Sequence, residues 1–505
     1  MIPKVSMEDF FMSKFLDSVG YSEEKQTSVK TEIIAGIVTF LTMAYILTVN
    51  PLQILWGGVA DPRWSSVFMA TAFGAVIGTL LMAFLAKMPL AQASGMGLNA
   101  MVGSMLGGVY GAFTQSGTFM VVLISGLIFL LLSVINIKGK TFRELVFDGM
   151  PVPVRGAISV GIGLFIAYIG FQNAGIIVAS PYTISDLVVF SAWGAGWKLA
   201  VAPAVVALIG LGTIAILDKF DVKGSVIIGI VVATIIGIPF GVTDLSVLKG
   251  DGAISWKFWE NFANFFTVGE ESVFLSFTGV FKEGFGGSVF TIIMLVITFC
   301  MIDMFDTMGT IVGCCGGNRI LSDENNKPRN YDKIMISDAV ATCTGAMLGT
   351  STVTTFVESG AGVSAGGRTG LTAFVTACLF FLSIFIMPVF AAIPGAATAS
   401  ALIYVGVLMM KNNVKSIDFS NAINAVSAFL TIVVMVLAYS ITKGIGIGLV
   451  TYTLLSLIAY AVEWIVYAIK VKKDAELAKP VFPVSIIAII ITVLFLVYFL
   501  VPTVI

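Results

Sequence analysis

The sequence predicts an all-α polytopic membrane protein with 14 transmembrane spans in two inverted seven-helix repeats, plus an extra C-terminal helix. Three observations lead to this prediction. The composition is strongly apolar, fifteen apolar runs are separated by charged or Pro/Gly-rich breaks, and two pairs of matching segments occupy corresponding places in the two halves. Soluble, fibrous and disordered classes do not fit this pattern.

The composition is that of a chain that lies mostly in lipid. Of its 505 residues, 58% are apolar and 11% are charged, whereas a soluble domain carries about 25% charged residues. The net charge of −1 provides no basic surface for nucleic acid. Histidine is absent, which excludes Ser-His-Asp catalysis and His-based proton relays. The five cysteines have no metal-site spacing, so we expect neither a metal nor another cofactor.

The apolar runs define the expected spans in chain order. Spans three and ten, at 92–108 and 358–366, are short and rich in glycine, and we expect half-helices there. The run at 482–503 lies outside the seven-plus-seven scheme. We interpret it as an appended helix, with an interfacial helix as the alternative. The fifteen runs cover residues 31–50, 66–86, 92–108, 117–137, 153–172, 197–217, 224–241, 286–313, 333–350, 358–366, 370–389, 393–410, 421–442, 444–469 and 482–503.

The distribution of Lys and Arg predicts the orientation in the membrane. With a cytoplasmic N-terminus, alternate loops divide the 28 basic residues as 22 on the cytoplasmic side against 6 outside. This partition requires both short runs to count as crossings. The expected organisation is a cytoplasmic N-terminal segment (1–30) without a signal peptide, a first repeat (31–241), an extracellular linker (242–285), a second repeat (286–469) and a C-terminal segment (470–505).

The internal repeat is visible in two ordered matches. Residues 70–79 read ATAFGAVIGT and residues 341–350 read ATCTGAMLGT. Residues 93–100 read ASGMGLNA and residues 358–365 read ESGAGVSA. Because seven is an odd number of spans, the second copy is inverted relative to the first. Inverted repeats with broken helices near the midplane are typical of secondary transporters.

Of the acidic residues inside the apolar runs, four are candidates for the site: Asp303, Asp306, Asp338 and Glu358. An ionisable group in the hydrocarbon region costs about 2.5 kcal/mol or more on insertion scales, so it is expected to face a cavity, a partner or a ligand. Asp303 and Asp306 are three residues apart and share one helix face. Uncompensated carboxylates of this kind are candidate proton carriers.

The two half-helix segments are expected to frame one binding site. The run of Ser, Thr and Val before Glu358 favours an extended strand, and the backbone N–H groups that begin each half-helix point into the site. The alternative role of these glycines is close helix packing. A site with Gln92, Asn99, Asp303 and Glu358 suits a planar uncharged heterocycle, because ring N–H and amino groups can donate paired hydrogen bonds to a carboxylate. Candidates for a stacking face are Phe40, Tyr45, Phe305 and Phe356.

Four segments together resemble the AzgA-like purine permeases of the nucleobase–cation symporter-2 group. They are Thr31–Gly36 with Thr42–Pro51 in span one, Gly95–Ala100 in span three, Phe305–Thr310 in span eight and Glu358–Gly362 in span ten. The similarity runs in order along essentially the whole chain. The wider group often carries a histidine in span eight, and its absence here leaves ion coupling to a carboxylate.

The resemblance implies a fold, an activity and a set of site residues. Spans one to four and eight to eleven would form a core domain, and spans five to seven and twelve to fourteen a gate domain. The implied activity is proton-coupled uptake of hypoxanthine, guanine or adenine across the cell membrane by alternating access. The resemblance leaves open which purine is preferred, whether H⁺ or Na⁺ is coupled, and the oligomeric state, for which relatives with this layout suggest a homodimer through the gate domains. The expected substrate-binding residues are Asn99, Asp303, Glu358, Gly97, Gln92, Ser359 and Gly360, and the expected proton-coupling residues are Asp303, Asp306 and Glu358.

Three other classes of protein fit the sequence less well than a nucleobase transporter. An anion transporter of the sulfate-permease type has the same layout, but acidic side chains in the site disfavour an anion. An intramembrane aspartyl protease would need its two acids on different helices, whereas Asp303 and Asp306 share one. A channel would not need carboxylate-bearing half-helices. We therefore expect a transporter and not an enzyme.

Overall fold

The computed structural model describes residues 7–22, 26–55, 60–109, 112–137, 140–141, 149–180, 184–191, 197–222, 224–249, 254–267, 272–315, 319–322, 328–470 and 479–500. The chain divides into two compact units. Unit 1 comprises Met1–Val134, Ile169–Gly287 and Phe299–Tyr404, and unit 2 comprises Ile135–Tyr168, Ser288–Thr298 and Val405–Ile505. The expected division into core and gate spans, and the expected segment boundaries, stay predictions.

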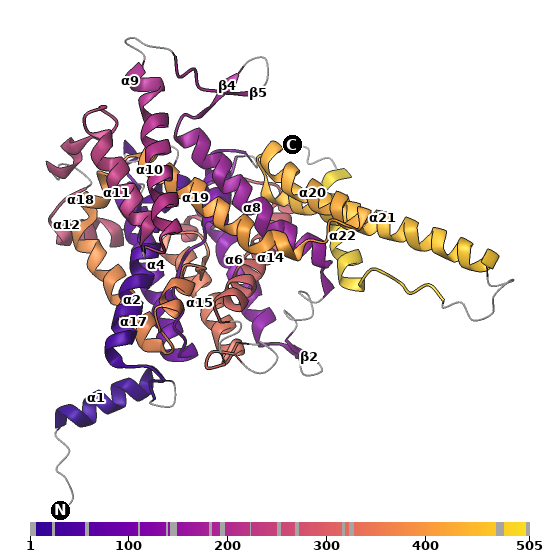
Figure 1. Ribbon diagram of the computed structural model, residues 1–505, viewed down its shortest axis with the longest axis horizontal. Coiled ribbons are helices and arrows are strands. Elements are labelled where there is room, and N and C mark those ends of the chain that lie inside the picture. The colour runs from indigo at the N-terminus through magenta and orange to yellow at the C-terminus, as the bar shows by residue number, and fades with distance from the viewer. Residues whose placement is uncertain are drawn as a thin grey trace, which may run out of the picture. The chain divides into compact units, whose positions relative to one another are not determined.

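The described residues are mostly helical, as Figure 1 shows. From the N-terminus to the first half-helix, the elements are α1 (Met7–Ser18), α2 (Val29–Met43), α3 (Ile46–Ile54), α4 (Trp64–Leu81), the π-helical turn η3 (Met82–Ala86), β1 (Gln92–Ser94) and α5 (Met96–Leu106). Up to the start of span eight they are α6 (Gln115–Val134), β2 (Asn136–Ile137), β3 (Lys140–Thr141), α8 (Val152–Asn173), β4 (Ile177–Ser180), β5 (Ile184–Leu187), α9 (Trp197–Ala200), α10 (Ala202–Lys219), α11 (Ser225–Gly237), η4 (Leu245–Lys249), α12 (Phe258–Phe266), η5 (Ser276–Gly279) and α13 (Val280–Glu283).

The second half of the chain contains the remaining elements. They are α14 (Val289–Cys315), α15 (Tyr331–Leu348), β6 (Val353–Thr355), α16 (Ser359–Ser364), α17 (Gly370–Ser383), η6 (Ile384–Ile386), α18 (Met387–Ala391), α19 (Gly395–Asn413), η7 (Val414–Ser416), α20 (Ala422–Leu437), α21 (Ile441–Lys470) and α22 (Ile486–Leu500). Each predicted apolar run contains a helix, including the appended one, which is α22.

Within the described residues, eight helices are long and apolar enough to cross a bilayer. Five shorter apolar helices accompany them: Met96–Leu106, Ser225–Gly237, Gly395–Lys411, Ala422–Leu437 and Ile486–Leu500. The protein is therefore a multi-pass membrane protein. The exact number of crossings and the inverted-repeat layout stay predictions.

The first span, Val29–Ile54, is locally irregular. It ends as α2 at Met43 and resumes as α3 at Ile46, with a turn at Ala44 and Tyr45. Pro51 lies inside α3. A proline has no N–H for the helix ladder, and its ring crowds the carbonyl four residues earlier. That carbonyl belongs to Leu47 within α3, so the proline does not by itself account for the turn at Ala44 and Tyr45.

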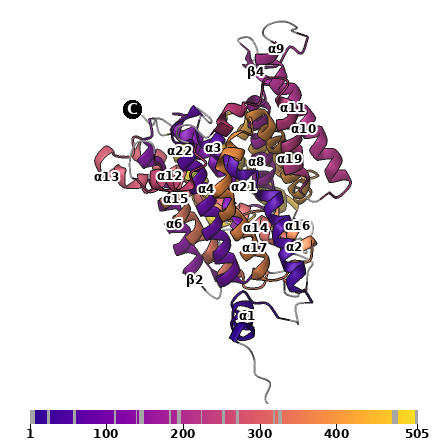
Figure 2. The same ribbon diagram turned by 90° about the vertical axis from the view of Figure 1, so that its left-hand side faces the viewer.

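Within unit 1, segments from the two sequence halves pack against each other. The matched segments 70–79 and 341–350 lie in α4 and α15, which are in contact. A Cβ at Gly78 would lie 3.1 Å from Cβ of Ala341, so small residues permit this approach. Helix α2 lies beside α17 (Figure 1) and beside α16 (Figure 2).

A buried carboxylate fixes α2 to the start of α17. Glu32 is fully buried, and it accepts hydrogen bonds from the backbone N–H of Arg368 at 2.9 Å and of Thr369 at 3.3 Å. The Thr372 hydroxyl donates to the same carboxylate at 2.5 Å. These donors precede or open α17, where N–H groups have no partner within the helix. Glu32 therefore links the first half of the chain to the segment that leads into α17.

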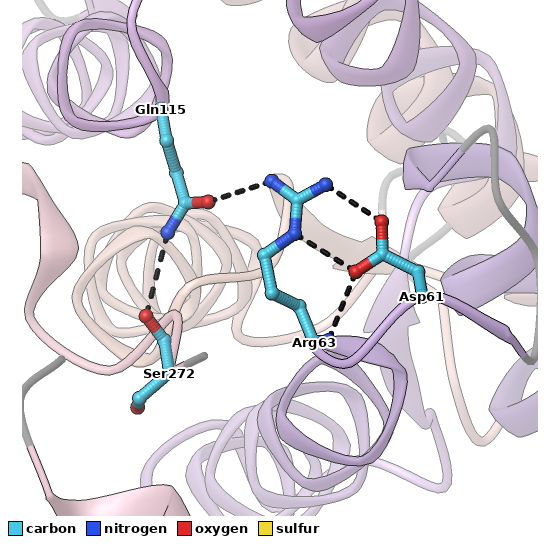
Figure 3. A network of polar contacts seen from close by, with 4 residues as sticks. All are labelled: Asp61, Arg63, Gln115 and Ser272. Atoms are coloured by element: carbon cyan, nitrogen blue, oxygen red, sulfur yellow. Dashed lines mark hydrogen bonds and ion pairs between the residues drawn. The ribbon is translucent and has the colours of Figure 1, made fainter. Parts of the chain in front are cut away.

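A polar network outside the spans joins the starts of α4 and α6, as Figure 3 shows. The Arg63 guanidinium donates to Asp61 at 2.7 and 2.9 Å and to Gln115 Oε1 at 2.9 Å. Gln115 Nε2 in turn donates to the carbonyl of Ser272 at 3.4 Å. Hydrogen bonds from the Arg63 side chain hold the pKa of Asp61 below its ordinary value.

In unit 2, the helices approach closely at glycine residues and are joined by a hydrogen bond between hydroxyl side chains. Helix α21 lies along α20, and a Cβ at Gly444 would lie 2.8 Å from the carbonyl of Thr431. The Thr453 and Thr492 hydroxyls share a hydrogen bond of 2.8 Å between α21 and α22. The appended helix is therefore packed on α21 rather than isolated.

Candidate functional site

The centre of the candidate site is a pair of short strands from the two sequence halves. Strands β1 and β6 pair antiparallel, with Gln92 opposite Thr355 and Ser94 opposite Val353. All residues of the two strands are buried. The β-branched run at Val353–Thr355 favours an extended backbone, and each strand leads within a few residues into a half-helix. The predicted strand before Glu358 and the predicted short helices after both segments are confirmed.

Hydrogen bonds tie the start of α16 to the segment before β1. The N–H of Ala91 donates to Ser359 Oγ at 3.0 Å, and the N–H of Phe356 donates to the carbonyl of Ala91 at 3.0 Å. Ser359, predicted to bind substrate, therefore anchors α16 in this state. Gly360 is partly exposed, and Gly97 is buried in the first turn of α5.

Glu358 is the acid at the start of α16. Its Oε1 accepts a hydrogen bond of 2.5 Å from the hydroxyl of Tyr45, and the side chain is partly exposed. Within the described residues, no Lys or Arg forms an ion pair with it. Tyr45 was predicted as a stacking ring, whereas here its hydroxyl is the group that contacts the site. A carboxylate has two acceptor oxygens, so Glu358 can accept a hydrogen bond from a further donor.

Asp306 on α14 is a second partly exposed acid. The charges of Asp338 and Glu358 both act on it, so each of these carboxylates lies within electrostatic range of Asp306. Asp306 and Glu358 are thus two partly exposed acids of the candidate site, and their roles toward substrate and proton stay predictions. The Phe305 side chain lies outside the described residues.

The side chain of Asp303, one turn earlier on α14, contacts helix α15. It is 1% exposed, and its Oδ2 accepts a hydrogen bond of 2.9 Å from Thr342 on α15. The same hydroxyl lies 3.2 Å from the carbonyl of Val353. In this state Asp303 therefore supports β6 and faces α15. Its predicted contact with substrate stays a prediction.

The carboxylate of Asp338 on α15 accepts hydrogen bonds from side chains of three other elements. Its Oδ1 accepts from Gln92 Nε2 at 2.9 Å and from the Thr355 hydroxyl at 3.2 Å, and its Oδ2 accepts from the Thr307 hydroxyl at 2.7 Å. Asp338, Gln92 and Thr307 are fully buried. Gln92, predicted to contact substrate, is engaged here in holding β1 to α15.

Asn99 is likewise engaged within the protein. It is fully buried, its Oδ1 accepts a hydrogen bond from Ser351, and its Nδ2 donates to the carbonyl of Ser94 at 3.3 Å. A further buried network lies nearby: Asn50 Nδ2 donates to Thr71 at 2.6 Å and to Thr350 at 2.7 Å, and Thr350 bonds Ser94 at 2.7 Å.

The sequence leaves open that Asp303 or Asp306 bonds Ser or Thr on a neighbouring helix, and Asp303 does so with Thr342. It does not identify the particular hydroxyl and amide partners in these networks, namely Asn50, Thr71, Thr307, Thr342, Thr350 and Ser351. The density of Ser and Thr at 350–355 was a usable signal, because hydroxyl groups inside an apolar span need partners. Within the described residues, no group of three or more Cys, Asp and Glu is arranged to hold a metal ion.

A multi-pass helical protein with two paired strand-and-half-helix segments in its interior has the architecture of a secondary membrane transporter. Residues 30–447 match the xanthine/uracil permease model, described as a permease family, and the chain belongs to this family. Its members are permeases, so the protein is a transporter and not an enzyme.

Two relatives illustrate the similarity. The adenine permease AdeP of Escherichia coli is 35% identical over 447 residues, covering 88% of this chain and 90% of the relative. The guanine/hypoxanthine permease PbuO of Bacillus subtilis is 36% identical over 433 residues, covering 85% and 92%.

Solved transporter structures share the fold at low sequence identity. The transmembrane domain of the cyanobacterial bicarbonate transporter BicA matches with a TM-score of 0.56 and 17% identity, covering 81% of this chain and 96% of that one. The overall structure of SLC26A9 matches with a TM-score of 0.57 and 10% identity, covering 90% and 70%.

Proposed function

We propose that this permease carries purine nucleobases (hypoxanthine, guanine or adenine) into the cell in symport with protons. The observation that carries the proposal is Glu358, a partly exposed carboxylate at the start of α16 beside the paired strands, which has no basic partner among the residues that the structure describes. A neutral purine offers ring N–H and amino donors, which a carboxylate accepts strongly. The names of the relatives AdeP and PbuO support the same substrate class.

Proton coupling would use the neighbouring acids. Asp306 lies within electrostatic range of Glu358, so one proton bound by the pair would relieve their repulsion. That proton would enter from the outside and leave to the cytoplasm together with the base. Asp303 stays a further candidate for the proton, although it is buried against Thr342 in this state. The predicted contacts of Asn99 and Gln92 with the base require their internal hydrogen bonds to open.

Alternating access would proceed across 14 spans in two inverted repeats, with a cytoplasmic N-terminus. The apolar runs, the two matched segment pairs and the distribution of basic residues support this layout. A homodimer through the gate domains stays part of the proposal. These features rest on the sequence and on the fold shared with solved transporters.

Anion transport is the alternative, since BicA is named a bicarbonate transporter and shares the fold. The chemistry of the site favours the purine. An anion site needs a cation or a set of unopposed donors, whereas the accessible side chains here include Asp306 and Glu358, and within the described residues no basic side chain is paired with Glu358.

Uptake by the purified protein in proteoliposomes tests the proposal. With an inward proton gradient we expect accumulation of labelled hypoxanthine, guanine or adenine, loss of accumulation with a protonophore, and no uptake of sulfate or bicarbonate. Glu358→Gln should abolish purine binding, while Glu260→Gln, which alters a surface ion pair with Lys257, should not. Purine uptake that is unchanged in Glu358→Gln would contradict the site assignment.

A further inference from the structure

Helix α12, in the segment between the two predicted repeats, has an aromatic side and a polar side. Glu260 and Asn264 are four residues apart and share the polar side. With 9 residues, the helix is about 14 Å long, too short to cross a hydrocarbon core of about 30 Å. The residues that gather on the aromatic side are Phe258, Trp259, Phe262, Phe265 and Phe266.

Part of the aromatic side packs on two apolar spans of unit 1. Phe265 is 1% exposed, and its ring centroid lies 5.6 Å from that of Phe73 on α4. The ring of Phe262 meets the same phenylalanine edge-on at 5.6 Å. At the other end of α12, the ring of Phe258 lies 5.0 Å from that of Phe385 in η6. Helix α12 is therefore attached to the spans Trp64–Ala86 and Gly370–Ala391.

The rest of the aromatic side is open. Phe258 is 40% exposed, Trp259 57% and Phe266 48%. This surface continues onto the span Gly370–Ala391, because the ring of Phe385 lies 5.6 Å from that of Phe381, which is itself 40% exposed. Exposed apolar side chains of a bilayer-crossing helix face acyl chains. The open aromatic surface of α12 is thus continuous with a lipid-facing surface.

Polar contacts mark the level at which water begins. On the polar side, Lys257 and Glu260 form an exposed ion pair at 3.0 Å. The hydroxyl of Ser272 donates to the carbonyl of Phe265 at 2.7 Å, and the carbonyl of Ser272 accepts from Gln115 in the network drawn in Figure 3. One side of α12 therefore meets solvated charges, while the other continues a surface that faces lipid.

We propose that α12 lies in the interface between membrane and water, with Trp259 and Phe266 at the boundary between phospholipid headgroups and acyl chains. Amphipathic helices lie in this zone with their apolar side toward the acyl chains, and tryptophan is enriched there. The partner of this surface is the phospholipid bilayer rather than another protein, because the surface continues that of a span that already faces lipid. The inference is independent of the transported substrate.

Spin labels on the full-length protein in phospholipid nanodiscs test this inference. The variants are Trp259→Cys on the aromatic side and Asn264→Cys, a matched control at an exposed position on the polar side of the same helix. The unmodified protein is labelled in parallel to subtract the signal of native cysteines, of which Cys378 is exposed. Collision rates are measured with oxygen, which concentrates among acyl chains, and with a water-soluble nickel chelate. Oxygen should dominate at 259 and the chelate at 264.

Each other result at position 259 overturns the inference. Collisions dominated by the nickel chelate at both positions would place the whole helix in water. Low collision rates with both reagents at 259 would show that protein, such as a second copy of the chain, covers the aromatic side. Should Trp259→Cys fail to fold, Phe266→Cys probes the same side with the same expectation, since this residue is also exposed. None of these results bears on purine transport, so the proposed function is tested separately.

Discussion

Nε2 of Gln92 donates a hydrogen bond of 2.9 Å to Oδ1 of Asp338, across 246 residues of sequence. The bond joins the strand before one half-helix to the long helix before the other. Thr307 and Thr355 complete the donor set, so the carboxylate of Asp338 organises four elements at once. The hydrogen bonds of Gln92 and Thr355 to Asp338 thus hold strands β1 and β6 against α15.

Asp338→Ala should destabilise the protein markedly. It removes the acceptor to which Gln92, Thr307 and Thr355 all donate, and a buried donor left unsatisfied costs about 1–3 kcal/mol. Asp338→Asn should cost less, since the Thr307 hydroxyl can accept from the new amide and donate to Thr354. Thermal unfolding in detergent measures both. Asp332→Ala, an exposed acid on the same helix, is the control, and an equal effect of Asp332→Ala and Asp338→Ala would contradict the role of this network.

Much of the site architecture follows from the sequence, and the partners of its side chains do not. Local composition at 350–367 is enough to predict a strand and a Gly-rich half-helix. Rotamers and contacts depend on residues hundreds of positions away. Asp303 turns to Thr342, Gln92 to Asp338 and Asn99 to Ser351, because buried polar groups take whichever donors or acceptors the packed fold supplies.

The irregular first span is a second feature whose exact position the sequence does not predict. An apolar run from 31 to 50 indicates a helix, and Pro51 at its end reads as a stop. In the folded chain the proline lies inside α3, and the deformation appears at Ala44 and Tyr45. The sequence therefore marks the irregularity but not the place where it aims a hydroxyl at Glu358.

Gly345→Ala should destabilise the protein by about 1–3 kcal/mol, the usual cost of overpacking a core. A Cβ there would lie 2.7 Å from Cγ2 of Val353 and 2.8 Å from the carbonyl of Ser351, and the backbone atom cannot yield without moving β6. Gly212→Ala on α10 is the matched control, because its Cβ would have no neighbour within 4 Å. That change should be neutral or stabilising by roughly 0.5–1 kcal/mol. Melting temperatures that fall equally in both variants would refute the packing argument.

The Asp61 and Arg63 pair should make stability depend on pH in the acid range. The pKa of Asp61 is lowered in the folded protein by hydrogen bonds from Arg63, whereas in the unfolded chain it is about 3.9. A lowered folded pKa contributes stability that is complete above the unfolded value and is lost as the pH falls through the folded value. The melting-temperature difference between the unmodified protein and Asp61→Asn should therefore be constant from about pH 7 to 5 and shrink below about pH 4. A difference that stays constant throughout would contradict this assignment.

Asp306→Asn should separate purine binding from proton coupling. The variant keeps Glu358 and its contact with Tyr45, so the base still has its acceptor, but the pair of acids can no longer share a proton. Exchange of labelled for unlabelled hypoxanthine across proteoliposomes, which needs no gradient, should persist, while accumulation driven by an inward proton gradient should be lost. Asp244→Asn, in an exposed loop, should retain both activities. Gradient-driven accumulation that survives in Asp306→Asn would assign the proton to Glu358 or Asp303 instead, because these are the other two predicted carriers in the site.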